Sequence, residues 1–142
     1  MTEAPVPVQQ GVAGPFWEAA RQGRLVAQRC QGCGHIFLPP RRWCPRCWSS
    51  ELEWTPCSGR GRVYSFTVVH QAPSPFFQER APYVLAIVEL EEGPRLMANI
   101  VGVEPGRVHI DMAVQVTFER RGEVSIPQFT PAEEGVPDAE AR

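Results

Sequence analysis

Two pairs of cysteines are the residues in this chain whose types and spacing are best suited to chemistry. Cys30 and Cys33 form one Cys-x-x-Cys pair, Cys44 and Cys47 form a second, and residues 34–43 separate the pairs. Four thiolates arranged in this way provide a tetrahedral ligand set for zinc or iron. Two disulfides are the alternative, but no secretory signal precedes the pairs and disulfides belong to oxidising compartments. We therefore expect a metal site, with structural Zn²⁺ as the ion.

A metal held by four cysteines has no open coordination position for a substrate or a reactive water. The sequence shows no Ser-His-Asp set, no paired carboxylates in a plausible pocket and no phosphate-cradling glycine loop. It also contains no lysine, which excludes Schiff-base chemistry and a P-loop. We therefore expect a protein that is not itself an enzyme.

Two further residues near the cysteine pairs, His35 and Cys57, are of types that can bind a metal or react. His35 lies two residues after Cys33, and it is not expected to bind the metal while four cysteines are present. Cys57 lies outside both pairs and is interpreted as a small buried apolar residue. A reactive thiol at Cys57 would need a base, for which His70 is the candidate nearby in sequence.

The bulk composition narrows the class of protein. The chain has 142 residues and a formal net charge of −2, with 43% hydrophobic and 21% charged residues. This length suits one domain or two small ones. A non-specific nucleic-acid binder is usually basic, so the charge argues against that function. No run approaches the ~18 apolar residues of a membrane span, and residues 1–13 do not resemble a signal peptide, so no membrane contact and a cytoplasmic location are predicted.

The elements that position the cysteines are predicted to be a short helix and a set of strands. Residues 16–22 have helical apolar spacing, with Gly23 as a C-terminal cap, and residues 25–29 form an extended run into Cys30. The segments rich in β-branched and aromatic residues, or with alternating polarity, are 62–70, 83–90, 95–101, 108–110, 114–119 and 124–129. Short strands with close turns predict a mainly β fold containing a small barrel, and OB-like and SH3-like barrels fit this pattern equally. The segment 83–90 is apolar enough to predict burial on both faces.

The chain is expected to have four parts. They are a flexible arm at 1–13, an N-terminal helix and metal ribbon at 14–57, a barrel at 58–130 and a disordered acidic tail at 131–142.

Aromatic residues and arginines are the candidate contact residues. Phe16 and Trp17 belong to the short helix, and Phe76 and Phe77 lie in the long loop 71–82, where they look exposed. Each pair either packs inside the fold or contributes to a partner or ligand surface. A second set, grouped in sequence beside the ribbon–barrel junction, consists of Arg41, Arg42, Arg60 and Arg62. Arginines around a four-thiolate zinc site of formal charge −2 either offset that charge or face an anionic ligand.

Several motifs together resemble the zinc-ribbon/OB-fold family first catalogued as domain of unknown function thirty-five. They are Phe16-Trp17-Glu18-Ala19-Ala20, Gly23-Arg24-Leu25, Gln28-Arg29-Cys30, Pro39-Pro40-Arg41, Cys44-Pro45, Gly59-Arg60-Gly61, Tyr64-Ser65-Phe66-Thr67-Val68-Val69, Pro82-Tyr83, Glu89-Leu90, Gly93-Pro94-Arg95-Leu96 and Asn99. The resemblance covers about residues 14–131. The chain departs from the pattern at Trp48, where a small residue is usual, and around 103–107, which is shorter than the helix of many OB folds.

The resemblance implies a rubredoxin-like zinc ribbon followed by an OB-fold barrel. It also implies a subunit that helps a partner enzyme to lodge acyl-CoA. The partner is a thiolase-fold enzyme, in a heterotetramer with an enzyme dimer, or a MaoC-like hydratase. The CoA nucleotide is anionic, so Arg41, Arg42, Arg60 and Arg62 are candidates to bind it. A nucleic-acid-binding ribbon and OB module, and a rubredoxin-like electron carrier holding iron, remain alternatives.

Overall fold

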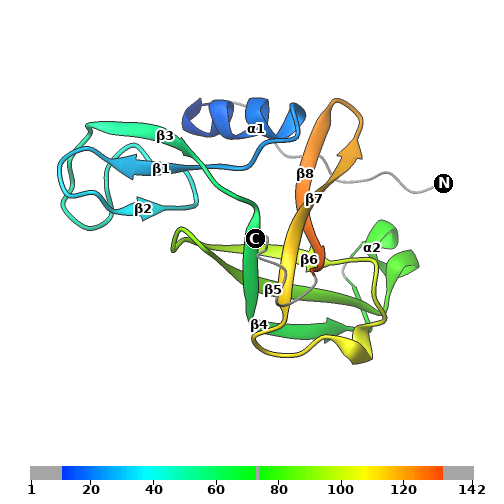
Figure 1. Cartoon of the computed structure of the whole chain (residues 1–142). Helices are drawn as coiled ribbons and strands as arrows, with labels where there is room; N and C mark the ends of the chain where they lie inside the picture. The colour runs from blue at the N-terminus through cyan, green and yellow to red at the C-terminus, as the bar shows by residue number, and fades with distance from the viewer. Residues whose placement is uncertain (1–10, 73, 133–142) are drawn as a thin grey trace.

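The computed structural model describes residues 11–72 and 74–132, which form a three-stranded ribbon, a closed five-stranded barrel and a helix beside both (Figure 1). The mainly β prediction is confirmed. Most of the arm and of the acidic tail predicted from the sequence, residues 1–10 and 133–142, lies outside the described residues. The division of the chain between residues 57 and 58 stays a prediction.

Helix α1 (Gly14–Arg21) follows a short 3-10 turn, η1 (Gly11–Ala13), and begins two residues earlier than predicted. Pro15 lies in its first turn, where a missing N–H costs nothing. The helix ends at Arg21, and Gly23, two residues later, has φ +77°. The N–H groups of Gly23 and Arg24 donate to the carbonyls of Ala20 and Ala19, both at 2.9 Å, which is the Schellman arrangement. The predicted glycine cap is therefore confirmed.

The ribbon is a small antiparallel sheet in which β1 (Val26–Cys30) lies between β2 (Ile36–Phe37) and β3 (Leu52–Pro56). Strand β3 was not predicted, because it is short and ends at Pro56. Its partner specifies it instead: all five of its residues pair with β1, from Val26 opposite Pro56 to Cys30 opposite Leu52. This pairing fixes the base of the cysteine site.

The barrel contains β4 (Arg60–Val69), β5 (Tyr83–Leu90), β6 (Arg95–Ile100), β7 (Ala113–Arg121) and β8 (Val124–Pro131). The strands follow the order β4-β5-β6-β8-β7, and β7 pairs with β4 to close the barrel. Strands β6 and β8 are parallel, whereas the other neighbours are antiparallel. This five-stranded closure is the OB arrangement rather than the SH3-like one that the pattern had left open.

A single hydrophobic core joins the helix, the base of the ribbon and the barrel. Its buried members are Phe16, Ala19, Leu25, Val26, Val63, Val84, Ala86, Val88, Leu90, Ala98, Ile100, Val108, Val114 and Phe129. Figure 1 shows α1 lying beside β8, which is consistent with this shared core. A second, smaller core contains Cys30, Phe37 and Cys44, with Leu52 packed against it. The cysteine site therefore has its own apolar support, separate from the main core.

Three predictions about the barrel are wrong. Residues 108–110 form no strand, and the 3-10 turn η2 (Pro105–Arg107) precedes them. Strand β5 is buried on one face alone: its inward residues alternate with Leu85 and Ile87, which are half-buried, and with exposed Glu89. The expected loop 71–82 contains helix α2 (Pro75–Arg80), where the Ser74 hydroxyl accepts a hydrogen bond from an N–H in the first turn.

Candidate metal centre and the surfaces around it

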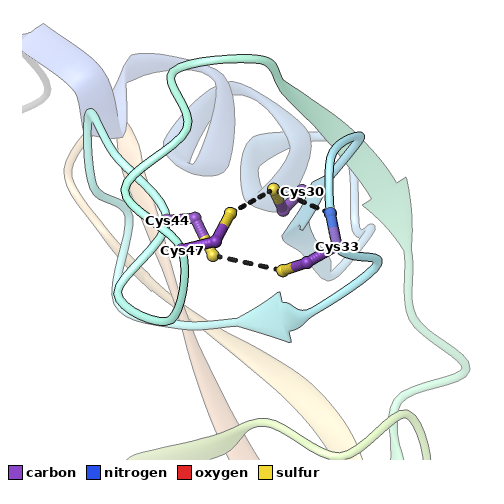
Figure 2. A group of neighbouring side chains, drawn as sticks. All are labelled: Cys30, Cys33, Cys44 and Cys47. Atoms are coloured by element: carbon purple, nitrogen blue, oxygen red, sulfur yellow. Dashed lines mark hydrogen bonds between the residues drawn. The ribbon is translucent and has the colours of Figure 1, made fainter.

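The four paired cysteines meet at one point, as Figure 2 shows. Their sulfur atoms all lie within 4.8 Å of one another. The Cys30 and Cys47 sulfurs are 3.5 Å apart, and those of Cys33 and Cys44 are 3.7 Å apart. Cys30 and Cys44 are fully buried, whereas Cys33 and Cys47 face outward. Each pair thus contributes one inner and one outer ligand.

Each Cys-x-x-Cys turn closes in the same way. The Gly34 N–H donates to the Cys30 carbonyl, and the Trp48 N–H donates to the Cys44 carbonyl, both at 2.8 Å. Both residues adopt the left-handed conformation, with φ +79° at Gly34 and +68° at Trp48. A left-handed residue after the second cysteine turns the chain back toward the metal site. Glycine adopts this conformation at no steric cost, whereas Trp48 adopts it with a large side chain.

Backbone N–H groups stabilise charge on the inner sulfurs. Cys30 Sγ accepts from the N–H groups of Gly32 at 3.3 Å and Cys33 at 3.4 Å, and Cys44 Sγ accepts from Arg46 N–H at 3.3 Å. The hydrogen bond from the Cys33 N–H is the main reason that the pKa of Cys30 falls to about 6. Burial acts to raise the pKa of Cys44, but N–H donors outweigh it and the pKa is lowered.

The fourth thiol shows the need for a cation. The N–H of Ser49 acts to lower the pKa of Cys47, but the hydrogen bond with Cys30, burial and the other two sulfurs raise it to about 12. Sulfurs this close cannot all carry a negative charge unless a cation lies between them. A tetrahedron with metal–sulfur bonds of ~2.3 Å has sulfur–sulfur edges of about 3.8 Å, close to the two short separations. The residues therefore fit a four-coordinate zinc or iron ion.

His35 and Cys57 have structural surroundings. The donor group found among the described residues contains the four paired cysteines and no histidine. His35 stacks on Phe37 with ring centroids 5.6 Å apart, and its pKa is lowered by burial and then by the Arg46 cation. Cys57 packs against the main core, and burial, assisted by the charge of Glu92, raises its pKa to about 12. The Cys57 thiol is thus protonated and unreactive at neutral pH.

The aromatic pair of α1 is largely absorbed by the fold. Phe16 is 6% exposed and belongs to the main core, so its proposed contact with a partner or acyl-CoA is not supported. Trp17 packs edge-on against Phe16 with centroids 4.9 Å apart and remains half-buried. The sequence spacing identified the helix but not how deeply its first ring is buried.

Phe76 and Phe77 are also less exposed than predicted, because α2 folds them against charged neighbours. Their rings meet edge-on at 5.1 Å, and the Arg80 guanidinium lies 4.7 Å from the Phe76 centroid. Arg121, 8% exposed, lies over both rings and donates to Glu119 at 2.9 Å. The two rings cap the end of the barrel at which α2 lies. Both are still partly exposed, so their contact with a partner or with acyl-CoA stays a prediction.

The four predicted arginines lie on two different elements. Arg60 forms an ion pair with Glu91 at 2.9 Å, and Arg62 donates to the Asp111 carbonyl at 2.8 Å, both on the barrel. Arg41 and Arg42 are exposed on the loop between the cysteine pairs. A groove of about 470 Å³ lies at the ribbon–barrel junction between residues 23–25, 56–58 and 115–118, and none of the four arginines lines it.

The most exposed large apolar side chains were not among the predicted contact residues. Among the described residues, Trp48 is 75% exposed, Met97 64%, Ile110 53%, Trp43 52% and Tyr64 49%. Met97 lies on the outer barrel face, beside a groove of about 240 Å³ that Leu85 and Ile87 also line. The alternation of β6 could have revealed Met97. For the two tryptophans, the available signal was their position: Trp43 directly precedes the second cysteine pair and Trp48 directly follows it.

The comparisons with known proteins agree with this geometry. Residues 17–53 match the model described as "ChsH2, rubredoxin-like zinc ribbon domain", and residues 54–119 match "ChsH2, C-terminal OB-fold domain". A DUF35 domain-containing scaffold protein of Methanocaldococcus jannaschii is 45% identical over 97 residues, covering 68% of each chain. This chain belongs to the DUF35 family. The predicted zinc ribbon and OB fold are thereby confirmed.

Other relatives have names that describe subunits of a hydratase and of a thiolase. A probable enoyl-CoA hydratase alpha subunit of Thermomonospora curvata is 44% identical, over 82% of this chain but 37% of the relative's length. The benzoylsuccinyl-CoA thiolase subunit BbsA of Thauera aromatica is 35% identical, over 70% of this chain and 69% of its own. The solved structure named Ltp2-ChsH2(DUF35) aldolase contains a chain 40% identical to this one, with a TM-score of 0.81 over 90% of this chain and 100% of that chain.

The described helices include none that is both long enough and apolar enough to cross a bilayer. The cytoplasmic location stays a prediction.

Proposed function

We propose that this DUF35 chain is a non-catalytic, zinc-containing subunit that binds a thiolase-fold enzyme and supports its acyl-CoA site. The observation that carries the proposal is the likeness to the DUF35 chain of the Ltp2-ChsH2 aldolase, which this chain matches over that chain's whole length. The name of BbsA, a thiolase subunit, supports the same class of partner. Two DUF35 chains on one enzyme dimer is the assembly that we expect.

The cysteine site supports a structural role within this function. Four cysteines fill the coordination of a zinc ion, so the metal has no position left for substrate. Zinc instead holds the two Cys-x-x-Cys turns together, above a small core that contains Cys30, Phe37 and Cys44. Metal analysis of the purified protein tests this point. One zinc per chain is expected, whereas a coloured protein with one iron would support the electron-carrier alternative.

Co-expression tests the partner. The chain is produced together with a thiolase-fold enzyme of its own genome, and the mixture is analysed by size-exclusion chromatography with light scattering. A stable complex of two chains with an enzyme dimer is expected, and a thiolase that functions without any such subunit serves as the control. Independent elution of chain and enzyme at micromolar concentration would contradict the proposal.

Acyl-CoA binding is the finer part of the proposal. The groove of about 470 Å³ at the ribbon–barrel junction is a candidate for the contact, with Arg24 at its edge as a group for an anion. Isothermal titration with acetyl-CoA compares the chain, the enzyme and the complex. Tighter binding by the complex than by the enzyme alone is expected. Equal binding by the two would remove acyl-CoA from this chain's role.

The hydratase relative favours a second candidate partner. The Thermomonospora curvata hydratase alpha subunit is 44% identical to this chain across the matched part. The same co-expression assay with a MaoC-like hydratase distinguishes the partners, because a complex with the hydratase but not with the thiolase-fold enzyme would assign the chain to hydration.

A further inference from the structure

The second Cys-x-x-Cys turn presents an exposed surface that the first turn lacks. This knuckle surface consists of Arg42, Trp43, Arg46 and Trp48, all of them exposed. Trp43 and Trp48 expose 52% and 75% of their area. Around the first turn, the corresponding residues are Gln28, Arg29, Gly32 and Gly34, and none of them is aromatic. The two halves of the ribbon are therefore alike in backbone but different in surface.

Trp48 occupies its position at a cost to the fold. Its φ of +68° places a bulky side chain in the left-handed region, where Gly34 in the first turn has no side chain to strain. The ring forms none of the aromatic pairs found among the described residues, and three quarters of it is exposed. Strain and apolar exposure at one residue, with only about a quarter of the side chain buried, indicate a side chain retained for an external contact.

The arginines of the knuckle surface are unpaired. Among the described residues, the side chains of Arg41, Arg42, Arg46 and Arg107 form no hydrogen bond or ion pair, unlike those of the other arginines, and three of these four lie in the ribbon. They do not donate to the cysteine sulfurs either, since the donors found there are backbone N–H groups. These cations are therefore available to a partner.

We infer that the knuckle surface docks on an acidic protein surface of the thiolase-fold enzyme, with Trp48 inserted as the central apolar anchor. The inference rests on the proposed function and adds where the two proteins meet. Tryptophan and arginine are the residue types most enriched among dominant interface contacts. Local positive charge selects an acidic partner surface, and the chain's net charge of −2 disfavours nucleic acid as the partner.

The exposed residues on the barrel are less suited to this role. The Tyr64 ring is covered by the Arg95 guanidinium, which lies 3.8 Å from its centroid, and Arg95 is already paired with Glu89 at 3.3 Å. The groove beside Met97 is lined by residues 65–67 and 85–87, none of which is charged. The knuckle surface thus combines rings and free charge in a way that the barrel face does not.

Binding measurements with matched variants test the inference. The zinc-loaded chain is titrated onto the thiolase-fold enzyme by biolayer interferometry, at low and high salt. Trp48→Gly and the double variant Arg42→Glu/Arg46→Glu are each expected to weaken binding about tenfold or more. Arg107→Glu, a control that reverses another exposed arginine with no side-chain partner, this one in η2 of the barrel, is expected to bind like the wild type. The salt dependence should be reduced in the double variant.

A stability measurement separates docking from folding. Trp48→Gly relieves the left-handed strain, so its melting temperature and zinc content should equal or exceed those of the wild type while its affinity falls. Wild-type affinity in both knuckle variants, with Met97→Glu abolishing binding, would overturn the inference and leave the proposed function intact. Failure of the wild type to bind would reject the proposed function itself. Single-stranded DNA bound by the wild type but not by the double variant would overturn the acidic protein partner.

Discussion

Gln28 and Arg41 hold each other through two hydrogen bonds that cross the ribbon. The Gln28 side-chain amide donates to the Arg41 carbonyl at 2.9 Å, and its oxygen accepts from the Arg41 N–H at 2.6 Å. Gln28 is 4% exposed and lies in β1, two residues before the first ligand, Cys30. One side chain therefore ties the central strand to the loop that carries the second cysteine pair.

Replacing Gln28 with alanine is expected to loosen the loop without unfolding the barrel. Both Arg41 backbone groups would lose their partners, and each lost hydrogen bond costs about 0.5–1.5 kcal/mol because Arg41 itself is exposed to water. The free energy of unfolding should fall by that order, and zinc should transfer faster to a chromogenic chelator. Gln31→Ala, which removes an exposed amide bonded to Glu53 at 3.2 Å, is the control. Equal behaviour of the two variants would show that the Gln28 pair does not support the site.

Removal of one ligand should separate structural zinc from ordinary cysteine packing. Cys44→Ser leaves three sulfurs and removes a buried group from the small ribbon core, so zinc content should fall to near zero and the ribbon should lose several kcal/mol of stability. Cys57→Ala is the matched control, because Cys57 lies outside the donor group. It should keep one zinc per chain. Unchanged zinc content and melting temperature in Cys44→Ser would contradict the ligand assignment.

The cysteines and the strands differ in how well the sequence predicts them. Spacing alone specified the four cysteines that lie together in the fold, because a Cys-x-x-Cys turn has few conformations that bring both sulfurs to one metal. The long strands were also predictable, since β-branched residues fill them. Strand β3 was not, because it depends on pairing with β1 rather than on its own composition. The strand predicted at residues 108–110 was wrong for the opposite reason. These residues are of strand-forming types but lie in a turn region, where Asp111 at φ +69° donates its N–H to the Val63 carbonyl.

The contact residues were harder to predict than the elements. An aromatic residue in a short helix is equally consistent with burial and with exposure. In α1, Phe16 is buried. In α2 the rings of Phe76 and Phe77 lie under Arg80 and Arg121. Because Arg121 belongs to β7, this contact joins two segments that are far apart in the sequence. Such long-range contacts leave no local pattern. The left-handed backbone of Trp48 likewise could not be predicted, because this conformation is typical of glycine rather than of tryptophan.

Glu119 is expected to give the barrel a pH-dependent stability. Burial acts to raise the pKa of this carboxyl, but Arg121 and Arg80 outweigh burial and hold the pKa below its usual value of 4.5. A lowered pKa in the folded state contributes stability above the unfolded pKa, and this contribution is lost as pH falls through the folded pKa. Glu119→Gln should therefore be less stable at pH 7, by about 1–3 kcal/mol for the lost charged hydrogen bonds.

The difference between wild type and Glu119→Gln should narrow as the pH is lowered below about 4.5, as urea unfolding at a series of pH values would show. Acid also protonates the zinc ligands, but that effect is common to both proteins and cancels in the comparison. A stability difference that stays constant down to the acid limit would show that Glu119 does not act through its charge.

Gly61 is expected to be essential for closing the barrel. It lies in β4 opposite both Leu90 of β5 and Val114 of β7, so it joins the first strand to two neighbours. A Cβ at this position would lie 2.5 Å from the Glu89 carbonyl oxygen and 2.9 Å from a Val88 methyl carbon, and the backbone would have to move to admit it.

Gly61→Ala should therefore lower the free energy of unfolding by about 1–3 kcal/mol, the usual cost of forcing extra volume into a packed site. Urea unfolding followed by circular dichroism measures it. Gly106→Ala is the control, because a Cβ there meets nothing within 4 Å and the residue has no positive φ. Zinc content should be normal in both variants, since the ribbon has its own core. A Gly61→Ala protein as stable as Gly106→Ala would show that β4 can shift against β5 without cost.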